Sequence, residues 1–269
     1  MKDLIDISVE AVRLGGDVLN RHFGKVDISK ARAKGTADYV SDVDRESEET
    51  MRAFLLKELP DSTFLGEEMG QDDEGKSYRW IVDPLDGTTN YLQRLSIFGV
   101  SAALERCIPG SEWGEIIAGA VFHPPTGDLW TAFKEKGAYR NGERITVSKK
   151  QELTTCLIAT GFPFRAKDEL GLYLKTFEKI FLRCSGIRRA GAASLDLCWT
   201  AEGVFDGFWE HRLSPWDIAA GGLIIKEAGG LFTSFRGDNI YLSAGNVVGA
   251  NPHLHPALIE IIKENVGDS

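Results

Sequence analysis

The spacing of apolar residues predicts two helices at the start of the chain. Apolar or small residues recur every three or four positions between residues 3 and 23, which places them on one face of an amphipathic helix. A second helix is predicted over residues 41–58. Ser41 is a suitable N-cap, acidic residues occupy the first turn, and Pro60 follows the end.

Further along, short apolar runs between turn residues predict strands, and Asn141-Gly142 marks a hairpin. Helices are predicted between these runs, one of them opened by Ser214 as cap and Pro215 as first helical residue. This order lacks the regular βαβα alternation of a Rossmann domain, and the sequence has no G-x-G-x-x-G motif. The predicted strands are 79–82, 97–104, 115–123, 128–134, 153–160, 204–209 and 247–250, and the predicted helices are 168–182, 192–202, 214–228 and one from about residue 254.

Composition narrows the class of protein. The 269 residues are 43% hydrophobic and 26% charged, as in an ordinary globular chain. The net charge of −9 disfavours nucleic acid or an anionic membrane as partner. An acidic N-terminus, no apolar run long enough to span a bilayer, and four cysteines without a C-x-x-C pair lead us to expect a cytoplasmic protein without a zinc knuckle.

The segment from Trp80 to Asn90, Trp-Ile-Val-Asp-Pro-Leu-Asp-Gly-Thr-Thr-Asn, carries the clearest chemistry. A strand is predicted to end before Asp83 and Asp86, and the proline and glycine beside them allow a tight bend. The two carboxylates and the Leu85 carbonyl can then face one point, which suits Mg²⁺. Thr88 opens a short helical turn whose N-terminus attracts an anion. The alternative is a capped loop in which Asp86 only accepts backbone hydrogen bonds.

Two other acidic residues strengthen the metal hypothesis. Glu67 follows an apolar run that reads as a strand end, and Asp217 lies in the first turn of the helix opened by Ser214. Taken singly, Glu67 is a solvated charge and Asp217 a residue that interacts with the helix dipole. Together with the Asp83/Asp86 pair, they predict a cluster of carboxylates that binds cations.

With these motifs, the chain resembles a known family, the inositol monophosphatases, which are Mg²⁺-dependent, lithium-sensitive phosphatases. The resemblance covers nearly the whole chain and implies an α+β fold, a layered αβαβα sandwich of two mixed sheets, in a single domain over residues 1–269. It also suggests a homodimer acting on a small phosphate ester. The motifs that carry it are residues 38–44, 66–68, 80–90, and 215–221 running on to 227–230.

The resemblance implies two or three Mg²⁺ ions per site. Glu67, Asp83 and the Leu85 carbonyl would hold the first. Asp83, Asp86 and Asp217 would hold the second, and a third would rely on Glu67 and waters. Metal ions neutralise phosphate oxygens and lower the pKa of bound water, so no Ser, Cys or His nucleophile is required.

The resemblance also implies catalytic and substrate-binding residues. Thr88 and Asp44 would orient and deprotonate the attacking water, with Glu67 as a further catalytic residue. Glu210 would bind a substrate hydroxyl, and Gly191 would begin a backbone contact to the substrate; the alternatives are a solvated charge at a strand end and a simple turn glycine. The residues expected to contact substrate are Asp86, Gly87, Thr88, Gly191, Ala192, Ala193, Glu210 and Asp217.

The sequence thus predicts an enzyme that hydrolyses inositol monophosphate. Arg165, Arg188 and Arg189 could bind a second phosphate, so a fructose-1,6-bisphosphatase or a dual-specificity enzyme is the main alternative; as solvated loop charges they would imply nothing about substrate. A nucleotide 3′-phosphatase, a histidinol-phosphatase and a non-catalytic regulatory protein are weaker alternatives. A phosphotransferase with an aspartyl-phosphate is disfavoured because its carboxylates stand two apart, not three.

Overall fold

The computed structural model describes residues 3–25, 32–35, 38–40, 42–72, 75–164 and 166–266. Its larger sheet has eight strands in the order β10-β9-β8-β7-β6-β5-β3-β4. Only β3 and β5 pair in parallel, so the sheet is mixed. The strands are β3 (Ser62–Gly66), β4 (Gly70–Gln71), β5 (Tyr78–Asp86), β6 (Gly99–Arg106), β7 (Glu115–His123), β8 (Asp128–Phe133), β9 (Gly137–Arg140) and β10 (Glu143–Arg144).

The second sheet has five strands in the order β12-β11-β13-β15-β14. Strand β11 runs parallel to both its neighbours and the remaining pairs are antiparallel. A short antiparallel pair, β1 (Arg32–Gly35) and β2 (Asp38–Val40), stands apart from both sheets. The strands of the second sheet are β11 (Leu157–Thr160), β12 (Gly186–Arg188), β13 (Gly207–Glu210), β14 (Leu231–Ser234) and β15 (Val247–Ala250).

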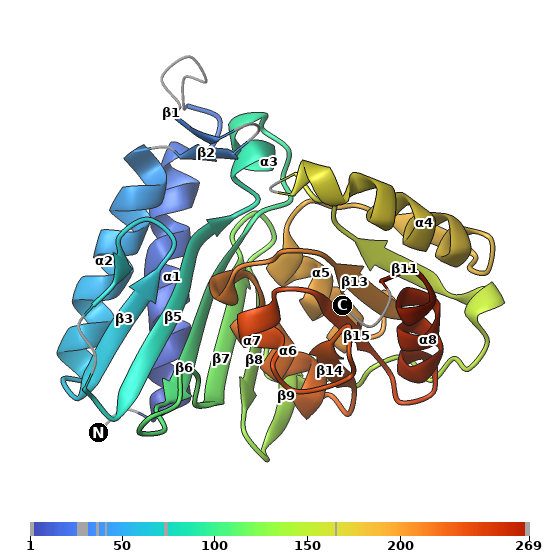
Figure 1. Cartoon of the computed structure of the whole chain (residues 1–269). Helices are drawn as coiled ribbons and strands as arrows, with labels where there is room; N and C mark the ends of the chain where they lie inside the picture. The colour runs from blue at the N-terminus through green and yellow to red at the C-terminus, as the bar shows by residue number, and fades with distance from the viewer. Residues whose placement is uncertain are drawn as a thin grey trace.

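Helices and sheets alternate in layers, as Figure 1 shows. Helices α1 and α2 cover one face of the large sheet, α5 and α6 lie between the two sheets, and α4 and α8 pack together on the outer side of the small one. The helices are α1 (Leu4–His22), α2 (Asp42–Glu58), α3 (Thr88–Leu92), α4 (Leu170–Phe181), α5 (Ala193–Ala201), α6 (Pro215–Glu227), α7 (Tyr241–Ala244) and α8 (Leu254–Val266). This is the layered α+β fold that the resemblance predicts.

Helix α6 packs between the two sheets and contacts strands of both. Its residues from Asp217 to Ile225 are all buried, as expected for a helix that is apolar on every side. Two glycines let its neighbours approach: a Cβ on Gly221 would meet Leu197 of α5 at 2.6 Å, and one on Gly222 would meet Phe232 of β14 at 2.7 Å. No helix among the described residues is both long and apolar enough to cross a membrane.

Most predicted elements are present, with several shifted boundaries. The strand predicted over 79–82 runs on to Asp86, and the one predicted over 204–209 is Gly207–Glu210. Only the second half of the predicted strand 153–160 is extended, because its first residues form a 3₁₀ turn. The predicted cap Ser41 lies outside the described residues. Strands β12 and β14 were not predicted, since runs of three or four residues give little periodic signal.

Candidate active site

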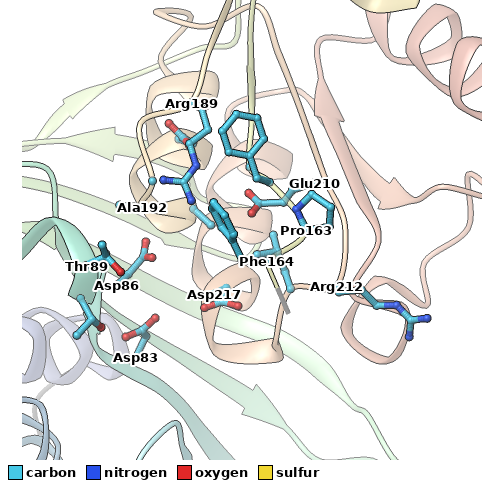
Figure 2. Close-up of a pocket in the computed structure, with 18 of the residues that line it drawn as sticks. Asp83, Asp86, Thr89, Pro163, Phe164, Arg189, Ala192, Glu210, Arg212 and Asp217 are labelled. Atoms are coloured by element: carbon cyan, nitrogen blue, oxygen red, sulfur yellow. The ribbon is translucent and has the colours of Figure 1, made fainter. Parts of the chain in front are cut away.

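A pocket opens where the end of β5 meets the first turns of α3, α5 and α6 and the end of β13 (Figure 2). Most of the residues that the sequence singled out line it. Asp44 and Arg188 are not among the described residues that line it. Arg165 lies outside the described part of the chain. The predicted residues that line the pocket are Glu67, Asp83, Leu85, Asp86, Gly87, Thr88, Arg189, Gly191, Ala192, Ala193, Glu210 and Asp217.

Asp83 and Asp86 lie within strand β5, which corrects the expectation that the strand ends before them. Asp83 faces Ser101 of β6 and Asp86 faces Gly99, so three steps along β5 match two along β6. This is a β-bulge, and the intervening proline, which has no N–H for the ladder, accounts for it. In a regular strand, side chains three positions apart point to opposite faces. The extra residue brings the two carboxylates to the same side.

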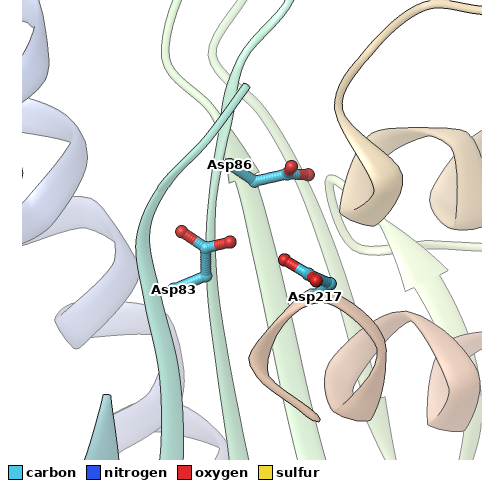
Figure 3. Close-up of side chains that lie close together, drawn as sticks. All are labelled: Asp83, Asp86 and Asp217. Carbon is cyan, nitrogen blue, oxygen red and sulfur yellow. The ribbon is translucent and has the colours of Figure 1, made fainter. Parts of the chain in front are cut away.

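Asp217 completes a cluster with these two residues. Oxygen atoms of Asp83, Asp86 and Asp217 lie within 4.8 Å of one another, and all three side chains are buried. Figure 3 shows the three carboxylates turned toward a common point. Burial raises the pKa of Asp83 well above its usual range, and the neighbouring charges of Glu67, Asp86 and Asp217 raise it further. Such a cluster favours bound cations or protons.

Local sequence explains how Asp217 reaches this cluster. Helix α6 begins at Pro215 after Ser214, as predicted. The Ser214 backbone N–H donates to Asp217 Oδ2 at 2.7 Å, so the carboxylate bends back over the helix N-terminus. This contact is half of a capping box, and Asp217 also lines the pocket.

Asp86 is held by hydrogen bonds from a residue of helix α5. Ser194, at the start of α5, donates to Asp86 Oδ2 from its backbone N–H at 2.7 Å and from its hydroxyl at 2.5 Å. Burial raises the pKa of Asp86, and these two hydrogen bonds oppose that rise. The sequence analysis did not find Ser194. Its only signal was a hydroxyl residue in the first turn of a predicted helix.

Glu67 stands on the turn between β3 and β4, and a buried residue of α2 fixes that turn. Glu48 accepts hydrogen bonds from the backbone N–H groups of Glu68 at 2.8 Å and Met69 at 3.0 Å. A Cβ on Gly66 would come within 1.9 Å of the Glu48 carboxylate, so only glycine fits there. Burial raises the pKa of Glu48 to about 7. Sequence reasoning missed Glu48 because it reads as one more acidic residue of an amphipathic helix.

Thr88 and Asp44 lie in the first turns of two different helices, α3 and α2. The Thr88 hydroxyl donates to the Leu85 carbonyl at 3.1 Å, at the start of α3. Asp44 is buried in the first turn of α2. One turn later, Ser47 donates to the Pro84 carbonyl at 3.1 Å, which ties α2 to the bulge of β5.

The segment around Gly191 is joined to the motif of residues 80–90. Asn90 donates through Nδ2 to the carbonyls of Ala190 at 2.9 Å and Ile97 at 2.8 Å. Gly87 and Gly191 both have positive φ, +89° and +90°, which favours glycine. A Cβ on Gly87 would lie 2.9 Å from the Ile97 carbonyl oxygen, so the close approach of these loops also excludes a side chain there.

Two arginines in the pocket differ in their partners. Arg212 donates through Nε to Glu169 at 2.8 Å and forms an ion pair with it. The Arg189 guanidinium lies 5.4 Å from the ring centre of Phe162 and 5.3 Å from that of Phe164, and forms no ion pair with any described residue. Among the described residues, Arg189 is therefore less neutralised by an ion pair than Arg212.

Comparison with known proteins agrees with this geometry. The profile of the Inositol monophosphatase family matches residues 1–266, and the chain belongs to that family. It is 43% identical over 265 residues to an inositol-1-monophosphatase of Rhizobium meliloti, covering 98% of this chain and 97% of that protein. It is 40% identical over 264 residues to a fructose-1,6-bisphosphatase/inositol-1-monophosphatase of Aquifex aeolicus, with 98% and 97% covered. The structure of the extragenic suppressor protein suhB from Bartonella henselae matches with a TM-score of 0.92 and 39% identity, covering 98% of this chain and all of that one (100%).

Proposed function

We propose that the protein is a Mg²⁺-dependent phosphomonoesterase that hydrolyses inositol monophosphate to inositol and phosphate with an activated water. The observation that carries the proposal is the buried cluster of Asp83, Asp86 and Asp217 at the wall of a pocket. The donors there are carboxylate oxygens, which are the ligands that hard divalent cations prefer. Membership of a phosphatase family supports the same chemistry.

The donor set suits two or three cations. In the proposal, Glu67, Asp83 and the Leu85 carbonyl hold one, Asp83, Asp86 and Asp217 hold another, and Glu67 with waters holds a third. When bound, Mg²⁺ supplies positive charge that neutralises phosphate oxygens and makes water more acidic. The protein residues orient these groups: Ser194 fixes Asp86, and the helix N-terminus fixes Asp217.

We assign the proton transfer to Thr88 and Asp44. The Thr88 hydroxyl, at the pocket wall, orients the attacking water, and Asp44, buried in the first turn of α2, accepts the proton. The backbone of Gly191, Ala192 and Ala193 at the start of α5 contacts the substrate, where helix N–H groups favour an anion. Glu210 at the end of β13 accepts a hydrogen bond from a substrate hydroxyl.

A second substrate class, a sugar bisphosphate such as fructose 1,6-bisphosphate, is favoured by Arg189. Its guanidinium lines the pocket without an ion pair among the described residues, so a second phosphate would find a cation there. The Aquifex aeolicus relative carries both activities in its name. Arg212 is less suited to this role because Glu169 already neutralises it.

Assembly and location are proposed on the family resemblance. The whole chain, residues 1–269, is taken as one domain that forms a homodimer in the cytoplasm. Helices α5 and α6 pack against both sheets, which supports a single folded unit. Light scattering on the purified protein tests the dimer.

The decisive experiment compares steady-state hydrolysis of inositol 1-phosphate and fructose 1,6-bisphosphate with Mg²⁺ and with excess EDTA. We expect turnover of inositol 1-phosphate that EDTA abolishes and Mg²⁺ restores. Mg²⁺ should also raise the melting temperature, since a ligand that binds only the folded state stabilises it. Full activity in EDTA, or no hydrolysis of either ester, contradicts the proposal.

A further inference from the structure

A buried acidic residue in the pocket is not used by the reaction described above. Asp196 lies in the first turn of α5, its residue is 1% exposed, and it is part of the pocket lining. Its Oδ1 atom is buried and has no hydrogen-bond partner among the described residues. The neighbouring Thr200 hydroxyl bonds to the Asp196 backbone carbonyl and leaves the side chain unpaired.

Two other buried carboxylates show the contrast. Asp206 accepts from Ser148 at 2.5 Å and pairs with Lys150 at 2.8 Å, and Glu105 accepts from Arg79 at 2.5 Å. A buried polar atom without a partner costs more than a hydrogen bond usually contributes, so native proteins rarely keep one. Where such an atom lines a pocket, the missing partner is most simply a ligand.

The surroundings of Asp196 indicate what that ligand carries. Burial raises the pKa of Asp196 well above its usual range, Glu210 and Asp86 add to the rise, and Arg189 opposes it. A carboxyl whose pKa is raised keeps its proton to a higher pH, and the protonated form can both donate and accept a hydrogen bond. A hydroxyl group, which also donates and accepts, is its natural complement.

The position within the pocket points to the leaving group of the substrate. Figure 2 shows Arg189 and Glu210 on the side of the pocket away from Asp83. Asp196 interacts electrostatically with both of these residues, and its helix packs against β13, which ends at Glu210. The phosphate belongs near the aspartate cluster, so the organic part of the ester extends toward Asp196 and Glu210.

We propose that Asp196 binds a hydroxyl group of a polyol phosphate, beside the hydroxyl held by Glu210, and so selects cyclitol or sugar esters over esters without hydroxyls. This inference rests on the proposed phosphatase function. Two neighbouring carboxyl groups then recognise two hydroxyls of the leaving group. An ester that lacks hydroxyls offers Asp196 no such partner.

The test compares inositol 1-phosphate with 4-nitrophenyl phosphate, which has no hydroxyl, at saturating Mg²⁺. Asp196→Leu should raise KM for inositol 1-phosphate roughly tenfold, while KM for 4-nitrophenyl phosphate stays within about twofold of wild type. Asp196→Asn, which keeps the shape and the hydrogen-bonding groups, should stay within about threefold for both esters. Thr200→Val, an isosteric loss of a hydroxyl on the same helix outside the described lining, controls for destabilisation of α5.

Equal losses on both esters in Asp196→Leu would show a structural role and overturn the inference, as would unchanged kinetics on both. If Asp196→Leu does not fold, Asp196→Ala removes the carboxyl without adding a branched side chain, and the same comparison decides. Failure of the proposed function looks different, because the wild-type protein would then not hydrolyse inositol 1-phosphate.

Discussion

Ser194 donates two hydrogen bonds to a single oxygen of Asp86, from its backbone N–H at 2.7 Å and its hydroxyl at 2.5 Å, across a separation of 108 residues. Asp86 ends strand β5 of the large sheet, and Ser194 lies at the start of α5, a helix that packs between the two sheets. The contact therefore sets the direction of a carboxylate of the aspartate cluster from an element far away in the chain. Its strength should be visible in both stability and catalysis.

Replacing Ser194 by Ala removes the hydroxyl and leaves the backbone N–H. We expect a loss of about 1–3 kcal/mol in the free energy of unfolding, because a buried carboxylate loses a donor. Catalytic efficiency should fall by about tenfold as Asp86 gains freedom to rotate. Ser101→Ala is the matched control: Ser101 is equally buried, and its hydroxyl has no partner among the described residues. Urea unfolding and steady-state kinetics measure both, and equal effects in the two variants contradict the prediction.

Asp217→Asn separates a capping role from a metal-binding role. Asparagine caps helices as well as aspartate, and its side-chain oxygen can still accept the Ser214 N–H. Metal-free stability should stay near wild type or rise, since one charge leaves a crowded cluster. Turnover should fall by orders of magnitude, and the Mg²⁺ concentration for half-maximal activity should increase. Unimpaired hydrolysis by the folded variant would remove the assignment of Asp217 to a cation.

Thr88→Ala tests the proton transfer. Loss of general-base assistance typically costs about 10²–10⁴-fold in turnover. The Mg²⁺ dependence should change far less, because the acidic residues remain. Thr88→Ser keeps the hydroxyl and should retain most of the activity. A turnover number close to wild type in Thr88→Ala would refute this role.

The raised pKa of Glu48 predicts that the stability of the metal-free protein depends on pH. Its folded pKa of about 7 lies above the ordinary value of 4.5, so the folded state binds the proton more tightly. Its contribution to stability is full below pH 4.5 and is lost as the pH rises toward 7, by up to about 3 kcal/mol. Glu48→Gln lacks this titration, while the other acidic groups titrate alike in both proteins. Urea unfolding in EDTA between pH 4.5 and 8 should show the difference, and parallel profiles would argue against it.

Arg189→Gln addresses the second substrate class. If Arg189 binds a second phosphate, KM for fructose 1,6-bisphosphate should rise by about tenfold or more, because a charged hydrogen bond is lost. KM for inositol 1-phosphate should change by less than about threefold. Arg188→Gln is the control, since Arg188 is exposed and its guanidinium bonds only to the Ile187 carbonyl within the described structure. Identical behaviour of the two variants would place the second phosphate elsewhere.

Sequence alone predicted the features that depend on neighbouring residues. The start of α6 at Ser214-Pro215 follows from capping preferences, and the Asn141-Gly142 turn from its need for positive φ, found at +51° and +83°. The sequence also predicted that Asp83, Asp86 and Asp217 form a cluster of carboxylates, and the structure brings their oxygen atoms within 4.8 Å of one another. The capping and turn signals act over one or two turns, which is the range that a local pattern covers.

Other features depended on the tertiary structure. The bulge that turns Asp83 and Asp86 to one side exists only through the pairing of β5 with β6. Ser194 and Glu48 acquire roles through contacts with residues far away in the chain, and Asp196 is distinguished only by burial without a partner. Burial and hydrogen-bond partners are set by how two sheets and the helices between them pack, and no local pattern in the sequence carries that information.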